Sequence, residues 1–167
     1  MSARILIHVQ HLLGSGHLKR MAAIGAGLVE AGFEVEIASG GRPLANLNAG
    51  GAHVAQLPSL RAVDSTFKAL VDENDQPIDD SWRARRRTAT MERYERFRPD
   101  AVIVELYPFG RRMLDFELAP LIERIRGAAN RPALLCSLRD ILVRPSAKHK
   151  EEQAVQRGGD WFDRILV

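Results

Sequence analysis

Cysteine, lysine and long apolar runs are all scarce in this sequence of 167 residues. Because Cys136 is its one cysteine, the chain cannot form an internal disulfide, which excludes a small secreted fold held by disulfides and favours the reducing cytoplasm. No apolar run approaches the roughly 18 residues of a membrane-spanning helix, and the run after Arg4 is too short for a signal peptide. We therefore expect a cytoplasmic protein with at most peripheral membrane contact.

Positive charge is present mainly as arginine, which supplies 20 of the 24 basic residues. The formal net charge of +3 is too small to indicate nucleic-acid binding, so no nucleic-acid partner is expected. Arginine suits bidentate binding of phosphate and carboxylate, although genome composition alone produces the same bias. The densest basic cluster, residues 83–87, precedes Glu92 and Glu95 at helical spacing and is interpreted as a solvated helix face.

The remaining composition is that of one globular domain, with 46% hydrophobic and 27% charged residues. Short apolar runs typical of strands alternate with longer segments of helical period. Residues 59–77 show no clear period and are expected to form a long surface loop. The expected strands are residues 4–9, 33–38, 53–57, 101–104, 132–137 and 162–167. The expected helices are residues 17–31, 78–97, 114–125 and 145–157, the third kinked or divided at Pro120.

Strands that alternate with crossover helices predict an α/β fold, a doubly wound, Rossmann-like parallel sheet of about six strands. The expected strand order is 3-2-1-4-5-6. In such sheets ligands bind beyond the carboxyl ends of the strands. The sequence ends on an expected strand with no helix after it, which suggests a fragment of a larger protein.

The first strand-to-helix turn, Gly14-Ser15-Gly16-His17, carries the clearest functional signal. It is not a dinucleotide-binding fingerprint, because Lys19 replaces the third glycine, and no Gly-Lys-Ser/Thr of a P-loop follows. Its backbone N–H groups at a helix start suit an anion. The positive helix end disfavours an imidazolium, so a neutral histidine there is able to accept a proton. A surface histidine that only packs the turn is the open alternative.

Charged residues also follow the fourth and fifth expected strands. Glu105 directly follows the fourth strand, and Arg111 and Arg112 open the next helix. A carboxylate beside guanidinium groups suits a sugar hydroxyl or a phosphate. Arg139 and Asp140 follow the fifth strand at the same end of the sheet. A structural ion pair is the alternative interpretation at both places.

Several of these segments together resemble the N-terminal half of GT-B glycosyltransferases. The resemblance rests on residues 14–17 (Gly-Ser-Gly-His), residues 19–21 (Lys-Arg-Met) and a helix ending at residues 30–32 (Glu-Ala-Gly). It is closest to the family-28 type and to bacterial predicted glycosyltransferases, which residues 105–112 and 137–140 resemble specifically. The UDP-sugar hydrolase of the pseudaminic acid pathway has a similar Gly-x-Gly-His turn.

The resemblance implies a two-domain enzyme that transfers a sugar from a nucleotide-diphosphate sugar. Residues 1–167 would form the N-terminal, acceptor-binding domain, and a C-terminal domain absent from this chain would bind the donor. His17 would be the catalytic base. The residues assigned to acceptor or phosphate binding are Gly14, Ser15, Gly16, Glu105, Arg111, Arg139 and Asp140.

The expected partners are a small-molecule or lipid-linked sugar acceptor and the C-terminal domain. No cofactor or metal is expected, because the five histidines lack the paired spacing of a zinc site. The chain alone is expected to be inactive and not to bind the nucleotide sugar. Two alternatives stay open: a nucleotide-sugar hydrolase of the same fold, and a non-catalytic module that binds a phosphorylated ligand.

Overall fold

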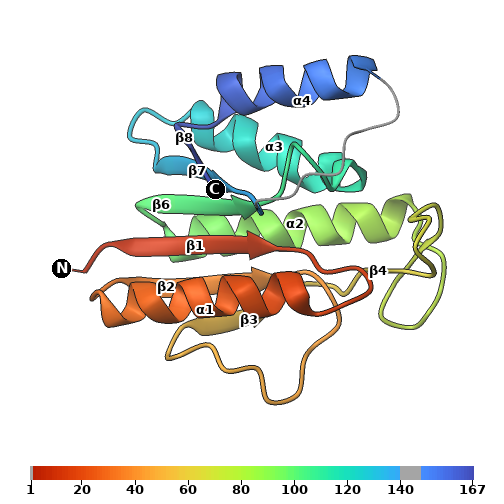
Figure 1. The fold of residues 1–167 in the computed structure, drawn as a ribbon, viewed down its shortest axis with the longest axis horizontal. Coiled ribbons are helices and arrows are strands. Elements are labelled where there is room, and N and C mark those ends of the chain that lie inside the picture. The colour runs from red at the N-terminus through yellow and green to blue at the C-terminus, as the bar shows by residue number, and fades with distance from the viewer. Residues whose placement is uncertain (1, 140–147) are drawn as a thin grey trace.

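The computed structural model describes residues 2–139 and 148–167. They form a six-stranded parallel sheet with helices and connecting segments on both faces (Figure 1). The strand order is β3-β2-β1-β6-β7-β8. Numbered within this sheet alone, that order is 3-2-1-4-5-6, so the predicted fold class and topology are confirmed. The strands are β1 (Arg4–Val9), β2 (Glu34–Ser39), β3 (His53–Gln56), β6 (Ala101–Glu105), β7 (Ala133–Ser137) and β8 (Arg164–Leu166).

Four α-helices accompany the sheet in the described part of the chain. They are α1 (Gly16–Glu30), α2 (Asp80–Phe97), α3 (Asp115–Arg126) and α4 (Lys148–Trp161), with a short 3₁₀ turn η1 (Arg112–Leu114) before α3. The fourth helix ends four residues later than predicted. α3 runs through Pro120 as one helix, so the predicted second helix at that point is wrong.

Residues 59–77 differ from the expected surface loop, because they contain a small antiparallel hairpin. Its strands are β4 (Arg61–Ala62) and β5 (Leu70–Val71). Leu60 and Ala62 are fully buried, and the Ala62 amide donates to the Leu12 carbonyl at 3.0 Å. The strands have two residues each, too short to show an alternating pattern in the sequence.

Apolar side chains cover both faces of the sheet, as near-continuous apolar strands require. On one face of the sheet, α1 and the connection from β2 to β3 pack on apolar side chains of β1 and β2, including Ile7 and Ile37. On the other face, α2 and α3 pack on Leu6, Val102 and Leu134. We call the residues at and just after the carboxyl ends of the strands the carboxyl edge.

One buried residue contradicts the sequence interpretation of the basic cluster. Arg86 of α2 is 0% exposed, whereas Arg85 and Arg87 are exposed as predicted for a solvated face. Its position follows from helical spacing, since Trp82, Arg86 and Thr90 recur every four residues on the buried side of α2. Within the described residues, no helix has the length and apolarity needed to span a bilayer.

Candidate functional site at the carboxyl edge

His17 and Glu105 come from two different strand–helix connections and form a hydrogen-bonded pair at the carboxyl edge. Glu105 is the last residue of β6, and His17 is the second residue of α1. His17 Nδ1 lies 2.7 Å from Glu105 Oε1. The Glu105 side chain is fully buried, whereas 18% of the His17 side chain is exposed. The structure therefore brings together two residues that the sequence singled out separately.

This pairing determines which nitrogen of His17 is available for chemistry. A carboxylate only accepts hydrogen bonds, so Nδ1 carries the proton and Nε2 presents its lone pair. A buried carboxylate in this position orients the ring and stabilises the imidazolium that forms when Nε2 takes up a proton. Because the His17 ring is partly exposed, an incoming hydroxyl group can reach it.

Arg111 supplies positive charge beside this pair. Its backbone is left-handed, with φ 59°, and its Nε donates to the Gln10 carbonyl at 3.3 Å. Burial lowers the pKa of Arg111, and the negative charge of Glu105 opposes that shift. The guanidinium stays charged at neutral pH all the same. The predicted neighbourhood of Glu105 and Arg111 is thus present in the structure.

His11 is a second histidine of the site, which the sequence reasoning did not assign to it. The side chain is buried, its Nδ1 has no partner among the described residues, and its ring lies against Gly41. Burial lowers the pKa of His11, and the charges of His17 and Arg111 lower it further, against an opposing contribution from the Arg42 backbone. Its position two residues after a strand end was the signal that the sequence offered.

Arg20, also unassigned by the sequence reasoning, ties α1 to the end of β7. Its Nη2 donates to Ser137 Oγ at 3.0 Å and to the Leu138 carbonyl at 2.6 Å. Ser137 is paired in register with Glu105 across β6 and β7. The guanidinium therefore fixes the start of α1, and with it His17, against the strands that carry Glu105.

The turn before α1 is open to solvent. Gly14 and Gly16 are exposed, and an added Cβ at either position would meet nothing within 4 Å. Ser15 occupies the N-cap position, yet its side chain makes no capping hydrogen bond, and the first helical turn holds no acidic residue. The first N–H groups of α1 thus have no side-chain cap, which suits an anionic group of a ligand.

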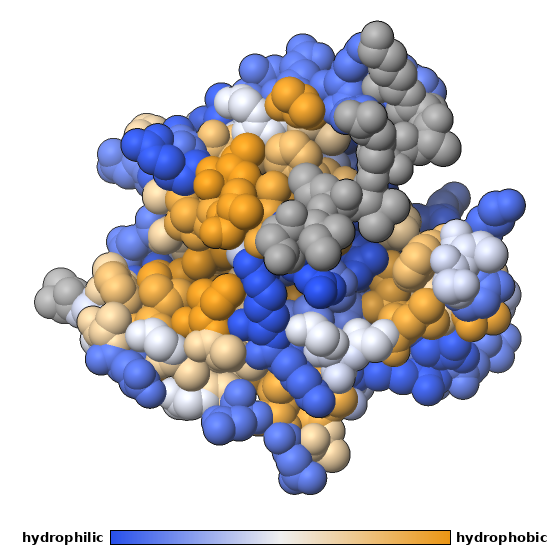
Figure 2. Space-filling view, viewed as in Figure 1, coloured by the Kyte–Doolittle hydropathy of each residue, from blue (hydrophilic) through white to orange (hydrophobic). Residues whose placement is uncertain are grey.

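The charged residues after β7 and around η1 differ in their surroundings. Arg139 is exposed at the end of β7. Asp140 lies outside the described residues. Arg112 donates to the Gln153 side chain of α4 at 3.2 Å. Hydrophilic side chains gather at the carboxyl ends of β1 and β6, beside the start of α1, with apolar surface on both sides (Figure 2).

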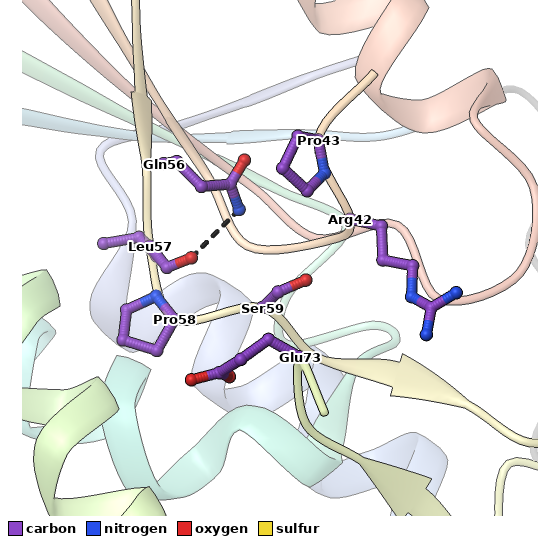
Figure 3. A pocket seen from close by; sticks show the side chains of 7 residues that line it. All are labelled: Arg42, Pro43, Gln56, Leu57, Pro58, Ser59 and Glu73. Carbon is purple, nitrogen blue, oxygen red and sulfur yellow. Dashed lines mark hydrogen bonds between the residues drawn. The ribbon is translucent and has the colours of Figure 1, made fainter. Parts of the chain in front are cut away.

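A pocket of about 550 Å³ lies beyond the carboxyl ends of β2 and β3 (Figure 3). Its side chains combine opposite charges with apolar rings and a buried hydroxyl. They are Arg42, Pro43, Gln56, Leu57, Pro58, Ser59 and Glu73. Ser59 Oγ is buried and has no hydrogen-bond partner among the described residues. Gln56 Nε2 donates to the carbonyls of Ser39, Gly41 and Leu57, which leaves its amide oxygen for a ligand.

The pocket adjoins His11, whose pKa the charge of His17 lowers. Gly41 lies against the His11 ring, and Arg42 follows directly as part of the pocket wall. His11 in turn lies within electrostatic range of His17. Among the described residues, no three histidine, cysteine, aspartate or glutamate side chains are grouped so as to hold a metal ion.

Comparison with solved structures shows which known proteins share this fold. No protein-family model matches the sequence, and no curated protein sequence matches it. The structure resembles the crystal structure of SsfS6, a glycosyltransferase of Streptomyces sp. SF2575, with a TM-score of 0.54 and 18% identity. The complex of SsfS6 with thymidine diphosphate matches with a TM-score of 0.50 and 17% identity. Each match covers 95% of this chain and 44% of the glycosyltransferase.

The fold is that of about half a GT-B glycosyltransferase. The chain spans less than half the length of the enzymes it resembles. At this level of identity the likeness concerns the fold, and the chemistry depends on the site itself. The closer resemblance to family 28 and to the UDP-sugar hydrolase stays a prediction from the sequence.

Proposed function

We propose that this chain is the acceptor-side domain of a GT-B glycosyltransferase, with His17 as its catalytic base. The observation that carries the proposal is the 2.7 Å contact between His17 Nδ1 and the buried Glu105 carboxylate. It lies at the carboxyl edge of a Rossmann-like sheet, where ligands of this architecture bind. The donor would be a nucleotide-diphosphate sugar held mainly by a second domain.

The pair supports a simple displacement at the sugar. Nε2 of His17 removes the proton of an acceptor hydroxyl while that oxygen forms a bond to the anomeric carbon. The bond from the anomeric carbon to the diphosphate breaks, and the nucleoside diphosphate leaves with the bonding electrons. Glu105 stabilises the imidazolium that results, and Arg111 limits the excess negative charge around Glu105 in the resting site.

The remaining predicted residues receive binding roles in this proposal. The uncapped turn of Gly14, Ser15 and Gly16 receives a phosphate or another anionic group at the start of α1. Arg139, exposed after β7, is proposed to bind an anionic group of the ligand. Asp140, for which the sequence predicts the same role, keeps it as a proposal.

The acceptor is proposed to enter through the pocket beyond β2 and β3. Arg42 pairs with Asp75, and Glu73 accepts from Trp82 Nε1 and from Arg85. Their remaining donors and lone pairs are proposed to bind hydroxyl groups, while Pro43 and Pro58 offer apolar rings. This combination fits a small polyhydroxylated molecule or the sugar of a lipid-linked acceptor. The location proposed for such an enzyme is the cytoplasm, with at most peripheral contact with a membrane.

The test compares two histidine–carboxylate pairs of the same chain, joined to its proposed donor-binding domain. His17→Ala should lower turnover by roughly 10²–10⁴-fold, because the base is lost. His53→Ala is the matched control: His53 Nδ1 pairs with Glu36 Oε2 at 3.0 Å, but away from the carboxyl edge. Unchanged turnover in His17→Ala would refute the assignment of the base. Free sugar as the product, without acceptor, would favour the hydrolase instead.

A further inference from the structure

A second charged cluster lies buried between α2, α3 and the sheet, outside the proposed catalytic pair. Arg86 contacts Glu117 through Nε at 2.8 Å and Nη2 at 2.9 Å, and both side chains are 0% exposed. Thr90 also donates to Glu117, at 2.7 Å, and His8 Nε2 lies 3.6 Å from it. Arg86 holds the pKa of Glu117 at about 2, well below its ordinary value, against the effect of burial.

Stability alone does not explain why Arg86 and Glu117 are buried, because removing both charges from water costs free energy. Desolvating two charges often outweighs their attraction, and apolar residues of similar size frequently stabilise a protein as well or better. A buried ionic cluster is explained more readily by a geometry that apolar residues cannot impose. The hydrogen bonds of Arg86 indicate which geometry that is.

All five N–H donors of Arg86 are used. Besides the two bonds to Glu117, Nη1 donates to the Gly40 carbonyl at 3.1 Å and to the Pro58 carbonyl at 2.6 Å. Nη2 donates to Gln10 Oε1 at 2.9 Å. Gln10, Gly40 and Pro58 follow the carboxyl ends of β1, β2 and β3 respectively. One planar guanidinium therefore joins three neighbouring connections of the carboxyl edge.

Gln10 passes this constraint on to the candidate site. Its Nε2 donates to the His11 carbonyl at 2.7 Å and to the Leu60 carbonyl at 2.9 Å. Its own carbonyl accepts from Arg111 Nε at 3.3 Å. The contacts are close, because an added Cβ at Gly40 would collide with both Arg86 and Gln10.

We propose that Arg86 is a positioning residue of the site: its guanidinium fixes the connections after β1, β2 and β3 in one arrangement. That arrangement holds His11, Gly41 and the wall of the adjoining pocket in place. The purpose of the arrangement rests on the proposed function, but the constraint itself is a property of the described chain. It is therefore measurable on residues 1–167 without substrate.

The experiment separates positioning from stability by amide hydrogen exchange. In the double variant Arg86→Met/Glu117→Leu the Gly40 and Pro58 carbonyls and Gln10 Oε1 lose their donor, so some of the free energy of unfolding should be lost. Both charges are replaced by apolar side chains, so no unpaired charge is left in the core. The Leu60 and Ala62 amides, which bond to Gly40 and Leu12, should exchange at least tenfold faster than in the wild type. Amides in the middle of β1, which report global unfolding, should accelerate by a clearly smaller factor than those of Leu60 and Ala62. Unchanged exchange at Leu60 and Ala62 would overturn the proposal.

Two single variants complete the test. Thr90→Val removes a hydrogen bond to Glu117 without touching the three connections, so exchange at Leu60 should stay at the wild-type rate. An equal acceleration there would mean general loosening and would refute the proposal. Arg86→Lys keeps a positive charge beside Glu117 but offers three donors instead of five, and it should accelerate exchange at Leu60 even if the double variant does not fold. Neither result depends on whether His17 is a base.

Discussion

At the scale of single residues, the candidate site contains buried polar atoms that have no hydrogen-bond partner among the described residues. Glu105 is a fully buried carboxylate, and its Oε2 has no hydrogen-bond partner among the described residues. His11 is a buried imidazole whose Nδ1 is likewise unpartnered. Buried polar atoms without partners cost free energy, so their concentration at one end of the sheet favours a functional role over a structural one.

His11 also makes the stability of the protein depend on pH. Its pKa is lowered by burial, so between the ordinary value near 6.5 and the lower folded value the unfolded chain binds more protons. The free energy of unfolding should therefore fall as pH falls through that window. One proton sets an upper limit of about 1.4 kcal/mol per pH unit.

The measurement compares urea unfolding of the wild type and His11→Phe at pH 7 and pH 5. Phenylalanine keeps a ring beside Gly41 and does not titrate, so the wild type should lose more stability than the variant on acidification. His53→Phe is the control, because the His53 side chain is 67% exposed. Equal losses in the wild type and His11→Phe would show that His11 is not the titrating group.

Single residues were predictable where their position relative to a strand end decides their role. Glu105 ends β6, and His17 and Arg111 lie where the connections after β1 and β6 lead into the next helix. The sequence placed all three at one end of the sheet. His11 and Arg20 were not assigned, because their roles depend on contacts with Gly41 and Ser137 that lie far away in the sequence. Pairing of side chains across strands is not encoded in local spacing.

At the scale of elements, the bounds of α2 were predicted well, but the prediction that residues 83–87 all face solvent was wrong for Arg86. The helix was predicted within two residues, and Asp79 caps it by accepting from the Trp82 amide at 2.7 Å. The dense run of arginines suggested solvent, yet spacing by four from Trp82 to Tyr94 puts Arg86 on the buried side. The prediction relied on the high charge of residues 83–87. The four-residue spacing from Trp82 would have placed Arg86 on the buried side.

Helix α3 yields a prediction that concerns its internal proline. Pro120 has no N–H to donate to the Phe116 carbonyl, and its ring crowds the preceding turn. Pro120→Ala should therefore raise the free energy of unfolding by about 1–2 kcal/mol, the gain being reduced because the unfolded chain becomes more flexible. Urea unfolding measures it, with the exposed Glu123→Ala as the control on the same helix. A variant no more stable than the wild type would mean that α3 already accommodates the proline without cost.

At the scale of the whole molecule, the topology was predictable because alternating strands and helices leave few arrangements. Right-handed crossovers and two apolar layers restrict six recognised strands to a few doubly wound orders, of which 3-2-1-4-5-6 is one. The hairpin β4–β5 was missed because its two-residue strands are stabilised by contacts with Leu12 and the core, not by their own pattern. Local sequence therefore specified the sheet, and tertiary contacts specified the segments that line the pocket.

The same topology leads to a prediction about ligands of the isolated chain. Nucleotide binding at the first turn needs a third glycine and an acidic residue after the second strand, but Lys19 and Gly40 occupy those positions. Space beneath Gly40 is filled by Arg86 and Gln10. In the proposed enzyme the donor binds to the second domain, so in titration calorimetry residues 1–167 should bind thymidine diphosphate or uridine diphosphate no more tightly than inorganic pyrophosphate. A dissociation constant below about 0.1 mM, which corresponds to a binding free energy of about 5.5 kcal/mol, would show that this chain binds the nucleotide and would contradict the proposal that the second domain does.

Titration with inorganic pyrophosphate tests the first turn separately. Binding heat that is lost in Ser15→Pro would locate an anion at the start of α1, as the proposed phosphate role of that turn requires.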